Sequence, residues 1–168
     1  MRGQTPVILI GIGGNLAHPP AATPEETVEA AVAALPAADI RVVVQSSWYA
    51  SEPIPASDQP WFVNGVIAVT SALAPQGLLD RLLALESEFG RIRGAPNAAR
   101  TLDLDLLDYD ARLVDKTTLI LPHPRLHLRR FVLEPLLEIA PGWRHPRLGL
   151  SAAELLDLLP PGQRAIRL

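Results

Sequence analysis

The chain has 168 residues, of which 48% are hydrophobic and 20% are charged; its formal net charge is −3 and it has no cysteine. This length and composition are typical of one soluble domain with a sizeable core. The negative charge argues against a nucleic-acid partner, and the lack of cysteine excludes disulfides and thiolate metal sites. No apolar run approaches the ~20 residues of a membrane span. We therefore expect a cytoplasmic protein without nucleic-acid or membrane partners.

The first third of the chain predicts strands, a helix and a loop in turn. Residues 6–12 are a β-branched apolar run followed by Gly-Gly-Asn, which indicates a buried strand and a tight turn. Residues 23–36 have helical periodicity, with Thr23 as the N-cap and proline at the first helical position. Residues 40–50 are strand-like. The three prolines of residues 51–60 predict a loop.

The middle of the chain continues with a strand, a helix and a second strand. Residues 61–73 are a long strand pattern, and residues 75–90 are a helical pattern that Gly90 ends. A charged loop over 91–100 follows. It leads into the leucine-rich strand 101–107.

The last third predicts a turn at 108–112, a short strand near 117–121, and helices over 129–141 and 151–160. Strands and helices interleave without a strict repeat, which favours an α+β or α/β sandwich. No linker is long enough to divide the chain. We therefore expect one domain over residues 1–168.

Asp103 and Asp105 stand two apart in a strand pattern, so their carboxylates share one face. The opposite face carries Leu102, Leu104 and Leu106. Parallel carboxylates repel each other unless a cation lies between them, and oxygen ligands without cysteine or clustered histidine favour Mg²⁺ or Mn²⁺. The alternative is a solvent-facing strand whose aspartates are balanced by arginines. Asp108 and Asp110 fall in the following turn, where we expect both to be solvated.

Fourteen of the fifteen basic residues are arginine. Six of these crowd the region around the two aspartates: Arg91, Arg93, Arg100, Arg125, Arg129 and Arg130. Arginine suits bidentate binding of phosphate. Glu86 adds a third carboxylate beside the apolar face of helix 75–90, which we expect to bury Leu79, Leu82, Leu83 and Phe89. Together these features describe a site for a polyphosphate–metal complex, although structural Arg–Glu pairing and an arginine-rich genome are the simpler alternatives.

A second candidate pocket comes from Phe62 and Asn64, which share one face of their strand. The amide of asparagine both donates and accepts hydrogen bonds, so it suits the edge of a nitrogen heterocycle on which a phenyl ring can stack. A core phenylalanine and a turn-capping asparagine are the alternative. The chain has no Walker A loop, and its Gly-Gly-Asn turn lacks the spacing of a dinucleotide fingerprint.

Five stretches in order closely resemble the 6-hydroxymethyl-7,8-dihydropterin pyrophosphokinase family of folate biosynthesis. They are GGN, SSWYASEPI with DQPWFVN, LLALESEFGRIR, RTLDLDLLDYD and LPHPRLHLRRFVLEPLLEIAP. The resemblance covers residues 7 to about 160. It implies a ferredoxin-like α/β sandwich with a mainly antiparallel sheet, a monomer, and transfer of pyrophosphate from ATP to the pterin hydroxymethyl group with release of AMP.

The resemblance also implies roles for individual residues. Two Mg²⁺ ions would be held by Asp103 and Asp105. The ATP site would be lined by Glu86, Arg91, Arg93, Leu106, His123 and Arg129. Transition-state charge would be stabilised by Arg91 and Arg100. The pterin pocket would be formed by Ser51, Ile54, Phe62, Asn64 and Phe131.

The chain departs from the family pattern in the loop before Arg100, which reads PNAAR and lacks the usual tryptophan. Thr118 and Pro124 also replace a frequent basic residue and a common aromatic. Two other functions remain open from the residues alone. One is a ligand-binding module without catalysis, and the other is a metal-dependent nuclease or phosphohydrolase that uses the same aspartates.

Overall fold

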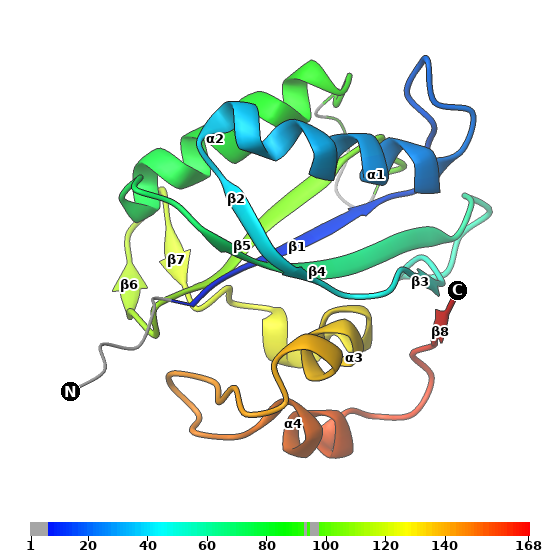
Figure 1. Ribbon diagram of the computed structural model, residues 1–168. Coiled ribbons are helices and arrows are strands. Elements are labelled where there is room, and N and C mark those ends of the chain that lie inside the picture. Colours follow the sequence, from blue (N-terminus) through cyan, green and yellow to red (C-terminus); the bar gives the residue numbers. More distant parts are fainter. Residues whose placement is uncertain (1–6, 93, 95–97) are drawn as a thin grey trace.

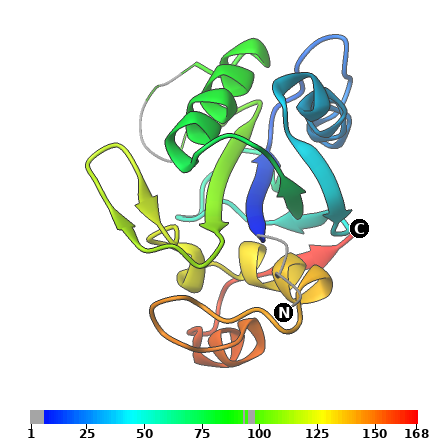
Figure 2. The ribbon, with the colours of Figure 1, turned by 60° about the vertical axis from the view of Figure 1, so that its left-hand side comes forward.

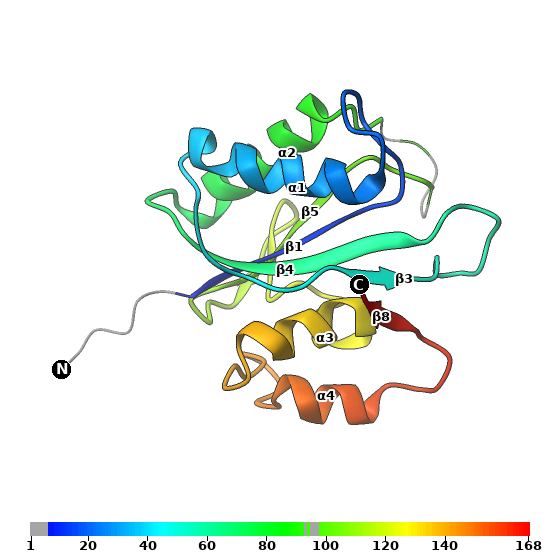
Figure 3. The same cartoon turned by 45° about the vertical axis from the view of Figure 1, so that its right-hand side comes forward.

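The computed structural model describes residues 7–92, 94 and 98–168. One sheet runs through the centre of the molecule, with helices on both of its faces (Figures 1 and 3). Two helices, α1 (Pro24–Ala34) and α2 (Pro75–Glu88), cover one face. The helices α3 (Arg130–Ile139) and α4 (Ala152–Leu158) cover the other. The predicted α+β sandwich is confirmed.

The strands are listed in chain order: β1 (Ile8–Gly14), β2 (Arg41–Gln45), β3 (Tyr49–Ser51), β4 (Phe62–Thr70), β5 (Asp103–Tyr109), β6 (Val114–Asp115), β7 (Ile120–Leu121) and β8 (Ala165–Arg167). Two short 3₁₀ helices are η1 (Leu35–Ala38) and η2 (Leu126–Leu128). The pair β6–β7 forms a separate two-stranded ribbon that projects beyond the end of β5 (Figure 2).

All pairings in the main sheet are antiparallel, in the order β5-β1-β4-β3-β8, and β2 pairs with the remaining part of β4. The central strand β1 therefore has a partner on each side. Ile10 lies opposite Ile67 of β4 and Leu106 of β5. In this arrangement β5 is an edge strand, so side chains along it can reach past the edge of the sheet as well as above its face.

The alternation of β1 divides the core into two. Ile8, Ile10 and Ile12 pack with α1 and α2 in one cluster, whereas Leu9 packs with α3 and α4 in another. This is the period of two that a strand covered on both faces requires. Both clusters share one sheet, and this continuity supports the expectation of a single domain.

Several predicted elements are confirmed at their ends. The Thr23 hydroxyl accepts a hydrogen bond from the backbone N–H of Glu26 at 3.1 Å, so it caps α1 as predicted. Gly90 follows α2 with φ +77°, the left-handed conformation that glycine favours after a helix. The predicted strand 40–50 is wrong as one element, because the chain breaks after Gln45 and resumes at Tyr49.

Three other predictions need correction. The strand β1 continues through Gly14, where a turn was expected. The predicted turn at 108–112 starts too early, since β5 runs to Tyr109. Asp108 is buried rather than solvated: it accepts hydrogen bonds from the indole of Trp143 at 2.8 Å and the backbone of Ala111 at 3.1 Å. The exposure expected of Asp110 is confirmed.

Candidate active site

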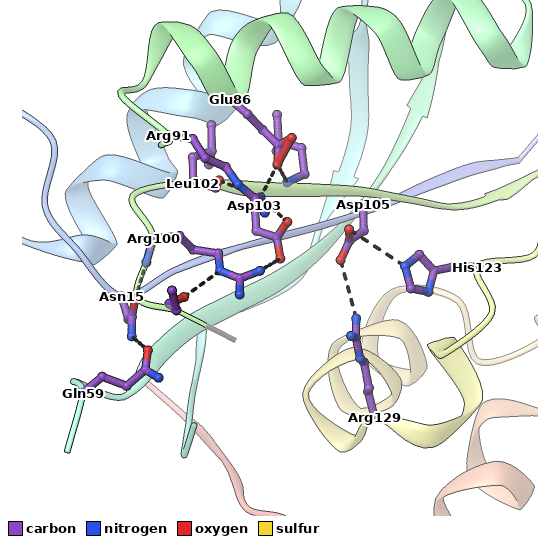
Figure 4. A network of polar contacts seen from close by, with 12 residues as sticks. Asn15, Gln59, Glu86, Arg91, Arg100, Leu102, Asp103, Asp105, His123 and Arg129 are labelled. Carbon is purple, nitrogen blue, oxygen red and sulfur yellow. Dashed lines mark hydrogen bonds and ion pairs between the residues drawn. The ribbon is translucent and has the colours of Figure 1, made fainter. Parts of the chain in front are cut away.

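The side chains of Asp103 and Asp105 point from β5 toward the same side, as their spacing predicts (Figure 4). Asp103 accepts a hydrogen bond at 2.6 Å from Nη1 of Arg91 and one at 3.2 Å from Nη1 of Arg100. Two guanidinium groups from the segment after α2 thus meet one carboxylate. Two of the arginines that cluster in the sequence, Arg91 and Arg100, therefore also lie together in space.

Glu86 lies on α2 with only 3% of its surface exposed, and it faces the same network. Its carboxylate accepts hydrogen bonds from Nη1 of Arg91 at 2.6 Å and from the backbone N–H of Leu104 at 3.1 Å. Burial opposes the charge of Arg91, but its hydrogen bond to Asp103 and the nearby carboxylates outweigh that effect and raise the pKa of Arg91. Arg91 is therefore a fixed cation between α2 and β5 (Figure 4).

Asp105 has looser partners than Asp103. Its oxygens lie 3.9 Å from Nε2 of His123 and 3.7 Å from Nη1 of Arg129, both beyond good hydrogen-bond distance. Burial and the charge of Asp103 raise the pKa of Asp105 to about 7. Burial and the charge of Arg129 lower the pKa of His123 to about 4, so this imidazole is neutral at pH 7. Asp105 thus has spare capacity to bind a cation.

The donor set of this site fits a hard divalent cation. Two carboxylates face one side, and a cation between them would relieve the repulsion that, after burial, raises the pKa of Asp105. Within residues 7–92, 94 and 98–168, no group of three or more His, Cys, Asp or Glu side chains forms a complete metal cage. Mg²⁺ does not need one, since it is commonly held by one or two carboxylates and completed by waters and substrate phosphates.

A cavity of about 270 Å³ opens on one side of the two aspartates. The predicted pterin residues line it: Ser51, Ile54, Phe62, Asn64 and Phe131. Phe62 and Asn64 face it together from β4, and the amide nitrogen of Asn64 donates a hydrogen bond to the Ser51 hydroxyl at 2.5 Å. The backbone of Gly13 in β1 lies directly beneath, where a Cβ atom would meet Oδ1 of Asn64. The two phenylalanines give this cavity aromatic walls, and polar and charged side chains, the two aspartates among them, line the rest. Aromatic walls with a few placed polar groups suit a flat ligand.

A second hollow opens on the other side of the same aspartates, under α2 and beside β7. Its lining includes the predicted nucleotide residues Glu86, Arg91, Leu106 and His123. Leu79 and Leu83 also line this hollow and are only half-buried, as is Phe89, so the prediction that these three are buried is wrong, whereas burial of Leu82 is confirmed. The helix also buries Leu78 and Leu85. Among the described residues, only Asp103 and Asp105 line both cavities.

Arg129 and Arg100 stand beside the first cavity, each over an aromatic ring. The Cζ atom of Arg129 lies 5.4 Å from the ring centre of Phe131, and that of Arg100 lies 5.9 Å from the ring centre of Phe62. These contacts place the guanidinium groups between the aromatic walls and the aspartates. Arg93, which was also predicted to line the ATP site, falls outside the described residues.

Asn15 is a supporting residue beside the site that the sequence reasoning missed. It is 1% exposed, and its side-chain oxygen accepts a hydrogen bond from the backbone N–H of Arg100 at 2.9 Å. Its side-chain nitrogen donates to Oε1 of Gln59 and to the carbonyl of Pro60, each at 2.9 Å. Asn15 therefore joins the loop after β1 to the two segments that carry Arg100 and Phe62 (Figure 4). The only sign of this role in the sequence is the position of Asn15 directly after two glycines.

The fold and the site define a class: an α+β protein in which two cavities meet at paired carboxylates among arginines, as a transferase acting between a phosphorylated donor and a flat ring requires. The family model for 7,8-dihydro-6-hydroxymethylpterin-pyrophosphokinase matches residues 9–141. The chain belongs to this family, and the resemblance inferred from its motifs is confirmed.

Similar proteins agree with this assignment. The chain is 42% identical over 156 residues to the 2-amino-4-hydroxy-6-hydroxymethyldihydropteridine pyrophosphokinase of Pseudomonas aeruginosa, covering 91% of each chain. It is 41% identical over 150 residues to the Synechocystis enzyme of the same name, covering 89% of this chain and 74% of that one. The crystal structure of Plasmodium falciparum HPPK-DHPS with pterin and p-hydroxybenzoate matches with a TM-score of 0.61 and 12% identity. That match covers 92% of this chain and 43% of the longer one, and it supports the fold alone.

Proposed function

We propose that this chain transfers pyrophosphate from ATP to the hydroxymethyl group of 6-hydroxymethyl-7,8-dihydropterin and releases AMP. Family membership supports the reaction. The observation that carries the proposal for this chain's own residues is that Asp103 and Asp105 line both cavities. An acceptor in the first cavity and a polyphosphate in the second would meet at these carboxylates.

The acceptor side would be formed by Phe62 and Phe131 around the ring, with Asn64 at its edge. Asn64 and Ser51 are tied by their hydrogen bond, so the polar end of the pocket is preorganised. The exposed Ile54 would complete the wall from the loop after β3.

The donor side would be formed by residues of α2, β5 and the segment after β7. Glu86 and Arg91 are already locked together there, and Leu106 and His123 complete the wall. His123 is neutral at pH 7, so it can donate or accept a hydrogen bond without adding charge. Arg93 is proposed for the same site from the family resemblance.

Asp103 and Asp105 would hold divalent cations, two Mg²⁺ ions in our proposal, which neutralise negative charge on the phosphates of ATP when bound. Arg91, Arg100 and Arg129 would neutralise the charge that remains. The pterin oxygen would form a bond to the β-phosphorus while the bond from that phosphorus to the α,β-bridging oxygen breaks, and the hydroxyl proton passes to solvent. Positioning and electrostatics supply the rate enhancement in this scheme.

An assay for AMP distinguishes this reaction from the alternatives. The chain is incubated with ATP and Mg²⁺, with and without the pterin. We expect AMP only when the pterin is present, in an amount equal to the pterin diphosphate formed. AMP without pterin would instead indicate a hydrolase. Tight pterin binding in calorimetry without any Mg²⁺-dependent binding of an ATP analogue would indicate a binding module.

We also propose that the chain acts as a single-domain monomer in the cytoplasm, without nucleic-acid or membrane partners. The two core clusters on one sheet support the single domain. No helix among the described residues is long and apolar enough to cross a membrane. Sedimentation equilibrium should give the mass of one chain, 18.1 kDa, and a mass of twice that value would contradict the monomer.

A further inference from the structure

Gln163 lies near the C-terminus, beyond the residues that the family model matches, yet it lines the first cavity. It precedes β8, which pairs with β3 so that Ala165 lies opposite Ser51. The last strand therefore brings a residue from outside the family match to the wall of the acceptor pocket. In Figure 3, β8 lies between β3 and the beginning of α3.

The carboxamide of Gln163 makes two hydrogen bonds to one short stretch of backbone. Its Nε2 donates to the carbonyl oxygen of Leu128 at 2.8 Å, and its Oε1 accepts from the backbone N–H of Arg130 at 2.8 Å. The two peptide groups that flank Arg129 are thus held by one planar group. In a β-sheet, a neighbouring strand makes the same two hydrogen bonds, one to a carbonyl oxygen and one from an N–H on either side of an extended residue.

Arg129 needs such a partner because of where it lies. It is the junction between η2 and α3, and its backbone is extended, with φ −121° and ψ 109°. No side chain at the N-cap of α3 accepts a hydrogen bond from the first turn. The oxygen of Gln163 therefore satisfies one of the N–H groups that a helix start leaves open.

The clamped backbone carries two side chains of the site. Nη1 of Arg129 lies 3.7 Å from Asp105, and the guanidinium lies over the ring of Phe131 in the first turn of α3. A change in φ or ψ at Arg129 would move its side chain relative to Asp105. It would also change the direction in which α3 presents Phe131 to the cavity.

We propose that Gln163 is a positioning residue for the acceptor pocket: its carboxamide clamps the peptides on either side of Arg129 and so sets the places of Arg129 and Phe131. The C-terminal segment around Gln163 is itself fixed. Arg164 forms an ion pair with Glu52 at 3.2 Å, and the N–H of Leu168 donates to the carbonyl of Trp48 at 2.9 Å. The effect on substrate rests on the proposed function, whereas the clamp does not.

The test replaces Gln163 with methionine, which keeps the length of the side chain but removes both hydrogen bonds. The first readout is amide hydrogen exchange at Arg130, followed by NMR, which we expect to accelerate roughly fivefold or more. The second readout is steady-state kinetics at a temperature well below the midpoint of thermal unfolding, so that the variant is folded. We expect KM for 6-hydroxymethyl-7,8-dihydropterin to rise roughly three- to tenfold, with a smaller change in kcat.

Arg167→Ala is the matched control, because Arg167 lies four residues further on, in β8, and pairs with Glu138 at 3.7 Å, away from the clamp. It should leave Arg130 exchange and the pterin KM within twofold of the unsubstituted chain. An equal rise in KM in both variants, or a faster Arg130 amide with an unchanged KM in Gln163→Met, would overturn the positioning role.

Two further outcomes are also decisive. If Gln163→Met does not fold, Gln163→Glu retains the oxygen that accepts from Arg130, so the Arg130 amide should stay protected while the pterin KM rises. Loss of protection in that variant, or an unchanged KM, would overturn the clamp. If the unsubstituted chain makes no AMP with pterin, the proposed function fails, and exchange at Arg130 in Gln163→Met still decides whether the clamp exists.

Discussion

Asp103 and Asp105 are two residues apart in one strand, but their surroundings give them different properties. Asp103 accepts hydrogen bonds from two arginines at 2.6 and 3.2 Å, whereas the contacts of Asp105 with His123 and Arg129 are longer, at 3.9 and 3.7 Å, and its pKa is raised to about 7. The first carboxylate is held in place by protein cations. In the proposed function the second would bind a cation that arrives with substrate, so the pair would combine a fixed ligand with an adaptable one.

Arg91 links Glu86 to Asp103, and its removal tests how much stability this link supplies. Replacing Arg91 with methionine removes a cation that lies 2.6 Å from a carboxylate that is only 3% exposed. We expect the free energy of unfolding to fall by about 2 to 3 kcal/mol. Urea unfolding measures this, and the double variant Arg91→Met with Glu86→Gln should lose much less. Equal losses in the single and double variants would contradict the link.

Strand β1 shows how an element forms the floor of the site. Gly11 and Gly13 lie on the same face, but the space above them differs. A Cβ atom at Gly13 would lie 2.5 Å from Oδ1 of Asn64 and 3.2 Å from the carbonyl of Val63, whereas one at Gly11 would touch Leu107 at 3.5 Å, an ordinary contact. Asn64 cannot easily yield, because it is buried and bonded to Ser51.

This difference predicts opposite outcomes for two matched substitutions. Gly13→Ala should lower the free energy of unfolding by about 1 to 3 kcal/mol and weaken pterin binding, because the new methyl group displaces Asn64. Gly11→Ala should change stability by less than about 1 kcal/mol. Urea unfolding and pterin titration measure both effects. Equal losses of stability and of pterin binding in the two variants would contradict the argument that the close approach of Asn64 excludes a side chain at Gly13.

Helix α3 is attached to the sheet through Glu138. Its carboxylate accepts hydrogen bonds from the backbone and hydroxyl of Ser47, at 2.9 and 2.8 Å, and from the hydroxyl of Tyr49 at 2.7 Å. Burial raises the pKa of Glu138, but these hydrogen bonds outweigh burial and lower it overall. Burial and the same carboxylate raise the pKa of Tyr49 to about 12.

The lowered pKa of Glu138 gives its contribution a definite pH dependence. Since the folded state holds the proton less tightly than the unfolded state, the stabilisation is present above the unfolded pKa of about 4.3 and is lost as pH falls through the folded pKa. Glu138→Gln should therefore cost about 1 to 2 kcal/mol at pH 7 and less at pH 3. Glu29→Gln on the exposed face of α1 serves as the control in urea unfolding. A cost for Glu138→Gln that does not change with pH would contradict the assignment.

The elements show why the sequence predicts some parts of this site and not others. Asp103, Asp105, Phe62 and Asn64 were predictable because each pair is two residues apart in a strand, a local relation that fixes a shared face. Gln163 and Asn15 were not, because their partners lie far away in sequence and their residue types have no chemical signature. Asp108 was misjudged for the same reason, since Trp143 comes from beyond α3.

At the scale of the molecule, one sheet brings together groups from nearly every part of the chain. Its edge strand β5 carries the aspartates between a hollow under α2 and a cavity beside α3. The order of its strands also brings the C-terminal β8 to β3, and Gln163, just before β8, lines the first cavity. The two substrates would therefore approach the carboxylates from opposite sides of one strand.

The most direct test of this account is AMP formation by Asp103→Asn in the presence of ATP, Mg²⁺ and the pterin. Asp110→Asn is the control, because Asp110 is exposed just past β5 and has φ 52°, which asparagine tolerates. We predict that Asp103→Asn lowers kcat at least about 100-fold and that Asp110→Asn keeps full activity. Full activity in Asp103→Asn would contradict the proposal that the paired aspartates hold the cations of the reaction.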